Sequence, residues 1–293
     1  MEVTVIEPHG FCGGVTAALK KALKALEAGG SVYCLHTLVH NEQVIADLAG
    51  RGMKFVESLS DVPGGSTVLF SAHGVSPKVR EEAARRSLNV IDATCPMVAR
   101  VHARVKEFAK DSIAVVVLGH RAHAETAGIA GEVGDPSRVA IVTRPSDIDS
   151  IAFDPPFGVV SQTTMNGAEV DALVKALKDR FGEDGALTDG ATHICNATDE
   201  RQQAVSAFAS ARPGAGVLVL GSSSSSNTLR LVEMAVRSGA KAWRAGSMEE
   251  LGQLDFSGIS ELGVTSGAST PESFLHGVVS TLRERFAAGG NVR

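Results

Sequence analysis

Residues 96–119 read PMVARVHARVKEFAKDSIAVVVLG, and this stretch decides the fold class. Its first part, Pro96–Lys110, repeats apolar residues at helical spacing and begins with proline, which favours the first turn of a helix. An apolar run, Ile113–Leu118, follows after two polar residues. A short run without polar alternation is typical of a strand covered on both faces, as in parallel sheets. The stretch therefore predicts a helix followed by a buried strand.

The same alternation extends in both directions from this stretch. Apolar runs that end in small or polar residues are Thr67–Ser71, Ile113–Gly119, Val139–Thr143, Gly158–Ser161, Gly216–Gly221 and Glu261–Thr265. Helical patterns are Val15–Ala28, Pro77–Arg86, Pro96–Lys110, Glu169–Phe181, Asp199–Ser210, Asn227–Ser238 and Pro271–Ala287. Strands that alternate with helices along the whole chain predict an α/β fold with parallel sheets.

Length, composition and charge exclude several classes of protein. The chain has 293 residues, 44% of them hydrophobic and 21% charged, which is typical of a folded globule and not of a disordered chain. Its net charge of −5 argues against a dedicated nucleic-acid binder. The longest apolar run is too short to span a bilayer, and no secretory signal is visible at the start. We therefore expect a cytoplasmic protein with reduced cysteines and no membrane partner.

Three of the four cysteines occupy comparable places. Cys12, Cys95 and Cys195 each lie just ahead of a predicted helix, whereas Cys34 lies inside an apolar run and is expected to be a buried strand residue. The three cysteines divide the chain into rough thirds. We therefore predict three α/β modules, at residues 1–94, 95–194 and 195–293.

The position of these cysteines suggests metal binding. Most cysteines outside disulfides are buried packing residues, and no C-x-x-C motif is present. A helix N-terminus, however, favours the thiolate, which is the form that binds metal. Three thiolates suit zinc or an iron–sulfur cluster, and a set of three leaves one metal position open for substrate.

Two small-residue loops have the character of anion sites. They are GSSSSSNTLRL at 221–231 and SGASTPESF at 266–274. Small residues at a helix start expose backbone N–H groups, and the helix dipole favours negative charge. Helix capping is the simpler interpretation of either loop, with Ser226 or Asn227 capping one helix and Thr270 with Pro271 starting the other. Several such loops at one sheet edge favour a phosphate or diphosphate ligand.

Three histidines and one carboxylate also lie in loops that follow predicted strands. His40, His73 and His123 follow predicted strands, where a ligand role and a structural hydrogen bond are equally expected. Glu125 lies in the loop of His123 and could donate a proton if partial burial raised its pKa; in any other loop a solvated surface glutamate would be the default. Five other histidines are interpreted as surface or packing residues: His9, His36, His102, His193 and His276.

Nine motifs in order give the chain a family resemblance. They are GFCGGV at 10–15, VHN at 39–41, FSAHGVS at 70–76, DATCP at 92–96, GHRAHAE at 119–125, SQTT at 161–164, ICNATDERQ at 194–202, SSNT at 225–228 and GVTSGAS at 263–269. With these motifs the chain closely resembles the LytB/IspH family of 4-hydroxy-3-methylbut-2-enyl diphosphate reductases. The match covers nearly the whole chain.

The resemblance implies a fold, a cofactor and a reaction. The fold would be three α/β modules around a central cavity, and a [4Fe–4S] cluster would be held by Cys12, Cys95 and Cys195 with one iron open. The reaction would remove the allylic hydroxyl with two electrons and two protons, giving isopentenyl and dimethylallyl diphosphate in the last step of the methylerythritol phosphate pathway. A ferredoxin or flavodoxin would supply the electrons.

The resemblance also implies roles for individual residues. Glu125 would be the proton source, with Thr163 near the substrate hydroxyl and His123 beside them. The residues that would bind the diphosphate substrate are His40, His73, His123, Thr163, Ser225, Ser226, Asn227 and Ser269.

The chain departs from the family pattern at three positions. Ser223 and Ser224 stand where the family usually has Lys and Asn, and His9 stands where it often has Arg. These departures leave open a specialised paralogue that acts as a cluster-dependent dehydratase or as a diphosphate-binding sensor.

Overall fold

A computed structural model describes residues 1–188 and 193–287 of the chain. In these ranges the strands form three four-stranded sheets, and all the strand pairings are parallel. The prediction of an α/β fold built from small parallel sheets is therefore confirmed. None of the helices in the described ranges has the length and apolar character needed to cross a bilayer.

The strands and helices alternate from one end of the chain to the other. The strands are β1 Glu2–Val5, β2 Val32–Leu35, β3 Lys54–Val56, β4 Thr67–Phe70, β5 Asn89–Asp92, β6 Ala114–Leu118, β7 Val139–Val142, β8 Phe157–Ser161, β9 Ala186–Leu187, β10 Gly216–Leu220, β11 Lys241–Ala245 and β12 Glu261–Ser266. The α-helices are α1 Gly13–Glu27, α2 Glu42–Gly50, α3 Pro77–Arg85, α4 Pro96–Lys110, α5 Ala124–Gly131, α6 Gly167–Phe181, α7 Asn196–Ala211, α8 Ser226–Arg237, α9 Met248–Gly252 and α10 Glu272–Ala287.

The chain forms two compact units. Unit 1 comprises Met1–Gly13, His40–Ala46 and the residues from Asn196 onward, and it contains the sheet ordered β1-β12-β10-β11. Unit 2 comprises Gly14–Val39 and Asp47–Cys195, and it contains the sheets β3-β2-β4-β5 and β7-β6-β8-β9. Division into three modules at residues 94 and 194 stays a prediction, as does a central cavity. Strand β1 pairs with β12, so the first strand of the chain belongs to the same sheet as its last.

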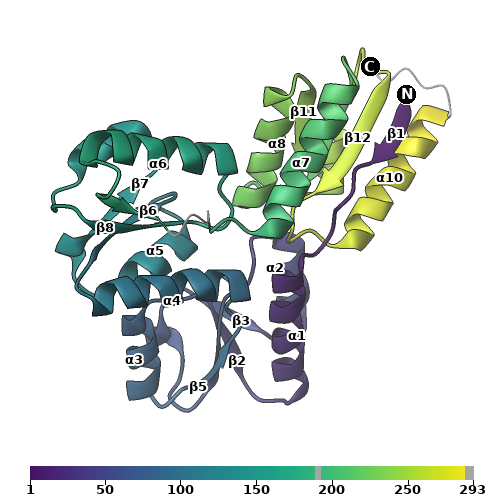
Figure 1. The fold of residues 1–293 in the computed structure, drawn as a ribbon. Coiled ribbons are helices and arrows are strands. Elements are labelled where there is room, and N and C mark those ends of the chain that lie inside the picture. The colour runs from purple at the N-terminus through teal and green to yellow at the C-terminus, as the bar shows by residue number, and fades with distance from the viewer. Residues whose placement is uncertain (189–192, 288–293) are drawn as a thin grey trace. The chain divides into compact units, whose positions relative to one another are not determined.

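The sheet of unit 1 is covered on both faces, as its apolar strands predict (Figure 1). Val217 and Val219 of β10 pack in a cluster with residues of α7 and α8, such as Leu231. Leu218 and Leu220 point to the opposite face and pack with residues of α10. Because successive side chains of a strand alternate between faces, an unbroken apolar strand is what a sheet between two helical layers requires.

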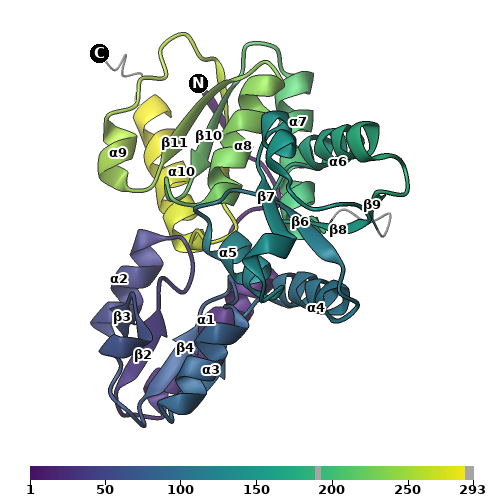
Figure 2. The ribbon, with the colours of Figure 1, turned by 90° about the vertical axis from the view of Figure 1, so that its left-hand side faces the viewer.

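The sheet β7-β6-β8-β9 of unit 2 follows the same rule. Val115 and Val117 of β6 pack with residues of α4 and α5, whereas Val116 and Leu118 pack with residues of α6. Figure 2 shows the other sheet of this unit, β3-β2-β4-β5, with α1 and α3 alongside it. Cys34 lies in β2 and is fully buried, which confirms its prediction as a strand residue.

Most predicted elements lie within three residues of the observed ones. Helix α4 begins and ends where its pattern predicts, because Pro96 sets the first turn and polar residues follow Lys110. Helix α7 begins at Asn196, three residues before the predicted start, so it follows Cys195 directly. The helices α2, α5 and α9 are absent from the predicted elements; each has fewer than ten residues, so its apolar pattern extends over few turns.

Candidate functional site

The serine loop, residues 221–227, leads from β10 into α8 in unit 1. Ser225 is the N-cap of α8, since its Oγ accepts a hydrogen bond from Thr228 N at 3.3 Å. Capping was expected from Ser226 or Asn227, so the cap lies one residue earlier than predicted. Asn227 is only 4% exposed, and neither its Oδ1 nor its Nδ2 has a hydrogen-bond partner among the described residues. A buried amide in this state costs free energy unless a ligand or water pairs with it.

The loop after β12 connects three of the quoted motifs within unit 1. Ser269 Oγ donates a hydrogen bond to the backbone oxygen of His40 at 2.9 Å. Cys12 N donates to Ala268 O at 3.1 Å, and Gly10 N donates to Ser266 Oγ at 2.8 Å. The segments that carry Cys12, His40 and Ser269 are therefore hydrogen-bonded neighbours.

The buried Arg201 of α7 supports the same segment. Its Nη2 donates to Gly10 O at 3.0 Å, and the residue is 4% exposed. Sequence reasoning did not single it out, although it lies inside the quoted motif at 194–202. A buried cation that bonds backbone carbonyls holds the GFC loop in a fixed conformation.

Burial shifts the titration of His40. Desolvation lowers the pKa of its imidazole, and the negative charge of Glu42 raises it, with the desolvation effect the larger. The lowered pKa favours the neutral ring of His40, and an anion bound beside it would favour the cation.

In unit 2, the rings of His73 and His123 lie together. Their centroids are 5.6 Å apart and their planes are nearly perpendicular. Ser71 Oγ lies 3.2 Å from His73 Nδ1. His123 is the N-cap of α5, and its Nδ1 accepts a hydrogen bond from Glu125 N at 3.2 Å. Because Nδ1 is the acceptor, the proton of the neutral ring is on Nε2.

Glu125 is the most strongly perturbed carboxyl group of this set. It is 2% exposed, and Oε1 accepts a hydrogen bond from Thr163 N at 2.6 Å. Desolvation raises the pKa of Glu125 to about 7, although hydrogen bonds from the backbone and side chain of Thr163 act in the opposite direction. The buried position of Glu125 excludes a solvated surface residue and meets the condition of burial on which the proton-donor role depends. A carboxyl group with a pKa near 7 can hold and release a proton at neutral pH.

Gln162 organises the loop that carries these groups. Its Oε1 accepts hydrogen bonds from His120 N at 3.1 Å and Thr126 Oγ1 at 3.2 Å, and its Nε2 donates to Thr164 Oγ1 at 2.8 Å. Gln162 is fully buried. It was not named as a site residue, although it stands inside the quoted SQTT motif.

Two cysteines are tied by backbone hydrogen bonds to this part of unit 2. Cys95 N donates to Ala72 O at 3.0 Å, next to His73, and Cys195 N donates to Thr163 O at 2.9 Å. Within unit 2, the structure thus connects the segments of His73, His123, Glu125, Thr163, Cys95 and Cys195.

The three cysteines share an environment that Cys34 lacks. Cys12, Cys95 and Cys195 are each partly exposed and each directly precedes a helix, as predicted. Burial raises the pKa of Cys34 to about 12, so its thiol is unsuited to bind metal. Three accessible thiols at helix N-termini are a suitable donor set for a soft metal or an iron–sulfur cluster. Among the described residues, no three His, Cys, Asp or Glu side chains are clustered closely enough to hold a metal ion, so the ligand set stays a prediction.

Comparison with known proteins gives one consistent result. The family described as "LytB protein" matches residues 3–283. A 4-hydroxy-3-methylbut-2-enyl diphosphate reductase of Cutibacterium acnes is 42% identical over 280 residues, which cover 94% of this chain and 84% of that protein. A reductase of the same name from Acidithiobacillus ferrooxidans is 38% identical and covers 97% of this chain and 89% of its own length.

Two solved structures are also similar. The E-1-hydroxy-2-methyl-but-2-enyl-4-diphosphate reductase of Plasmodium falciparum superposes with a TM-score of 0.89 at 33% identity, covering 96% of this chain and 88% of that one. A second structure is described as (E)-4-hydroxy-3-methyl-but-2-enyl diphosphate reductase, the terminal enzyme of the non-mevalonate pathway. It has a TM-score of 0.68 at 30% identity and covers 97% of this chain and all of that one.

Proposed function

Because this chain belongs to the LytB protein family, we propose that it reduces 4-hydroxy-3-methylbut-2-enyl diphosphate to isopentenyl and dimethylallyl diphosphate. The allylic C–O bond breaks, and two electrons and two protons enter. One proton leaves with the oxygen as water, and the other is added to an allylic carbon. Protonation at either end of the allyl group gives the two products.

The observation that carries this proposal is the environment of Glu125. A buried carboxyl group with a pKa of about 7 is protonated in a large fraction of molecules at neutral pH. Thr163 N at 2.6 Å fixes one carboxyl oxygen, so the acid has a defined orientation. We assign Glu125 as the donor of the proton that leaves with the hydroxyl oxygen, and we place Thr163 beside that hydroxyl.

We assign Cys12, Cys95 and Cys195 as the ligands of a [4Fe–4S] cluster. Their partial exposure and their position before helices suit this role, and the high pKa of Cys34 argues against a fourth protein ligand. When bound, a cluster with one open iron supplies electrons and a Lewis acid for the substrate hydroxyl. We assign a small one-electron carrier, of the ferredoxin or flavodoxin type, as the source of the two electrons.

The diphosphate end of the substrate is assigned to histidines, hydroxyls and one amide. Asn227 supports this assignment most directly, because its buried amide lacks a partner among the described residues. The N-terminus of α8 adds backbone N–H donors and a favourable dipole. The assigned residues are His40, His73, His123, Thr163, Ser225, Ser226, Asn227 and Ser269.

An anaerobic turnover assay tests the proposal. The protein would be reconstituted with iron and sulfide and supplied with reduced methyl viologen. We expect viologen oxidation only when 4-hydroxy-3-methylbut-2-enyl diphosphate is added. Turnover of the substrate without any electron donor would indicate a dehydratase. Substrate binding without turnover, in a protein with an intact cluster, would indicate a sensor.

A further inference from the structure

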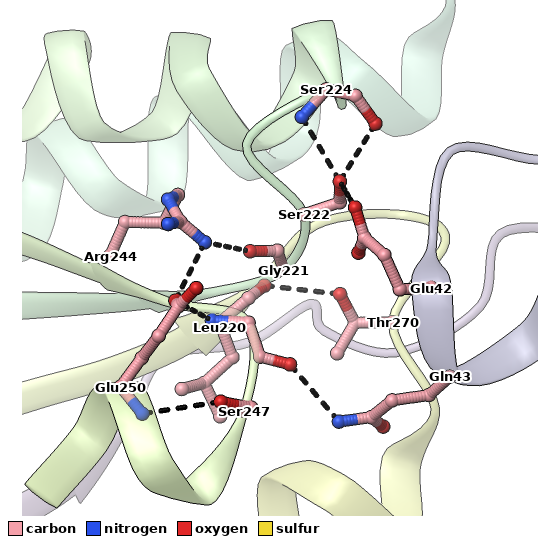
Figure 3. Close-up of polar contacts among 11 residues, drawn as sticks. Glu42, Gln43, Leu220, Gly221, Ser222, Ser224, Arg244, Ser247, Glu250 and Thr270 are labelled. Carbon is pink, nitrogen blue, oxygen red and sulfur yellow. Dashed lines mark hydrogen bonds and ion pairs between the residues drawn. The ribbon is translucent and has the colours of Figure 1, made fainter.

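Ser222, in the serine loop of unit 1, has every hydrogen-bonding capacity of its hydroxyl in use (Figure 3). Its Oγ donates to Glu42 Oε1 at 2.6 Å, accepts from Ser224 N at 3.0 Å and lies 2.8 Å from Ser224 Oγ. Since a hydroxyl has one proton and that proton points to Glu42, Ser224 Oγ is the donor in the last contact. Ser222 is 1% exposed, so loss of Glu42 would remove the charged acceptor that fixes the direction of a buried hydroxyl and would disturb its contacts with Ser224.

This hydroxyl is connected to the start of α8 through one turn. Ser225 N donates to Ser222 O at 3.3 Å, and Ser225 Oγ in turn caps the helix by accepting from Thr228 N. Asn227 lies between Ser225 and Thr228 in the sequence, and its buried amide has no hydrogen-bond partner among the described residues. The conformation that Glu42 imposes on Ser222 can therefore affect Asn227, the residue assigned to the diphosphate.

The helix turn that carries Glu42 is itself held to the loops of unit 1. Gln43 Nε2 donates to Gly246 O at 3.1 Å. Arg244 Nη1 donates to Gly221 O at 2.9 Å and pairs with Glu250 at 3.0 Å. Glu42 is exposed, but the contact of Gln43 holds its helix turn beside the loop of Gly246, and Arg244 holds the start of the serine loop.

We propose that Glu42 is a positioning residue for diphosphate binding, which acts through Ser222 on the turn that presents Asn227. The inference rests on the diphosphate assignment of the proposed function. The acceptor oxygen of Glu42 is what matters here, because its negative charge, taken alone, opposes the binding of an anion. A side chain that accepts the same hydrogen bond without the charge will therefore preserve the site.

The test compares Glu42→Gln with Glu42→Ala in the reconstituted holoenzyme. Both variants remove the charge, including its effect on His40, but only glutamine keeps an acceptor for Ser222. Calorimetry with inorganic pyrophosphate as the probe should give about five- to tenfold weaker binding to Glu42→Ala than to Glu42→Gln, as expected for one lost hydrogen bond to a buried hydroxyl. In turnover, Glu42→Ala should raise KM relative to Glu42→Gln and leave kcat unchanged.

The variant Ser222→Ala is a second, independent test of the proposal, and it can be measured even if Glu42→Ala fails to fold. It should weaken pyrophosphate binding as Glu42→Ala does, and the double variant should bind no more weakly than either single variant. Glu249, an exposed residue at the start of α9, supplies the matched control, since its Gln and Ala variants should bind pyrophosphate equally.

Equal pyrophosphate affinity in Glu42→Ala and Glu42→Gln, or additive losses in the double variant, would overturn the inference. Absence of pyrophosphate binding by the unmodified holoenzyme would overturn it as well. If the affinities follow the prediction but the substrate is not reduced, the positioning role stands and the proposed reaction fails. The two claims are thus separated by one set of measurements.

Discussion

At the scale of single residues, Glu125 is the group whose chemistry depends most on its surroundings. We predict that Glu125→Gln lowers kcat by about 100-fold or more, in line with the loss of a general acid. Glutamine keeps an oxygen for Thr163 N, so the loop should stay in place. The variant should keep its iron content and its cluster absorption, measured beside anaerobic kcat. Normal turnover in this variant would remove Glu125 from the mechanism.

The pH dependence of kcat tests the same residue in the unmodified protein. The donor is the protonated carboxyl, and burial raises its pKa from 4.5 to about 7. We therefore expect kcat to fall as the pH rises through about 7. Protonation of Glu125 also stabilises the fold, because the pKa of this group is higher in the folded chain than in the unfolded one. This contribution to stability is fully present below the unfolded pKa of 4.5 and is lost as the pH rises through about 7. An anaerobic pH profile without this descending limb would show that another group donates the proton.

The cysteines make a second prediction at this scale. Cys95→Ser should lose cluster iron and turnover, because a serine hydroxyl is a far poorer ligand for iron than a thiolate. Cys34→Ala is the matched control, since Cys34 is buried in β2 and its thiol has a pKa of about 12. Iron and sulfide are measured in both variants after identical reconstitution, and the two contents are compared. Equal iron in the two would exclude Cys95 as a ligand.

At the scale of elements, Gly74 controls how the loop after β4 packs in unit 2. Its φ is +77°, and a Cβ built on it would lie 2.7 Å from Nε2 of His102. His102 is not a surface residue: it is buried, and its Nδ1 pairs with Glu132 at 2.7 Å, so it has little freedom to move. The loop therefore approaches α4 closely only because position 74 lacks a side chain.

We predict that Gly74→Ala destabilises the protein by about 1–3 kcal/mol more than Gly65→Ala. Gly65 has nearly the same φ, +76°, but no atom lies within 4 Å of the position that a Cβ would occupy there, so the control isolates the steric clash. Urea unfolding of both variants gives the difference. Because His73 precedes Gly74, the first variant should also bind pyrophosphate more weakly. Equal stabilities would mean that His102 moves aside at no cost.

The sequence predicts elements and their ends better than it predicts which loops lie together. Helix α4 is fully specified by Pro96 and its apolar period, and the strand containing Cys34 by its unbroken apolar run. The contact between Glu42 and Ser222 joins residues 180 positions apart, and no local pattern encodes it. The burial of Glu125 also depends on distant segments, including Thr163, so the local sequence supports the proton-donor role only on the condition of burial.

At the scale of the whole molecule, each sheet has a core of its own. Five hydrophobic clusters of described residues pack against these sheets, and none of the five contains Cys12, Cys95 or Cys195. We predict that removal of the cluster by a chelator leaves the far-UV circular dichroism unchanged and costs stability of about 1–2 kcal/mol, or a few degrees in Tm. Loss of secondary structure on iron removal would show that the cluster is required for folding.

The most direct test of the account is product analysis after anaerobic turnover in D2O. With reduced methyl viologen and 4-hydroxy-3-methylbut-2-enyl diphosphate, we expect isopentenyl and dimethylallyl diphosphate, each carrying one deuteron from solvent on carbon. That result follows because one of the two protons leaves with the oxygen and the other joins the allyl group. Products that retain the oxygen atom of the allylic hydroxyl, or isopentenyl and dimethylallyl diphosphate without deuterium, would contradict reductive removal of the hydroxyl.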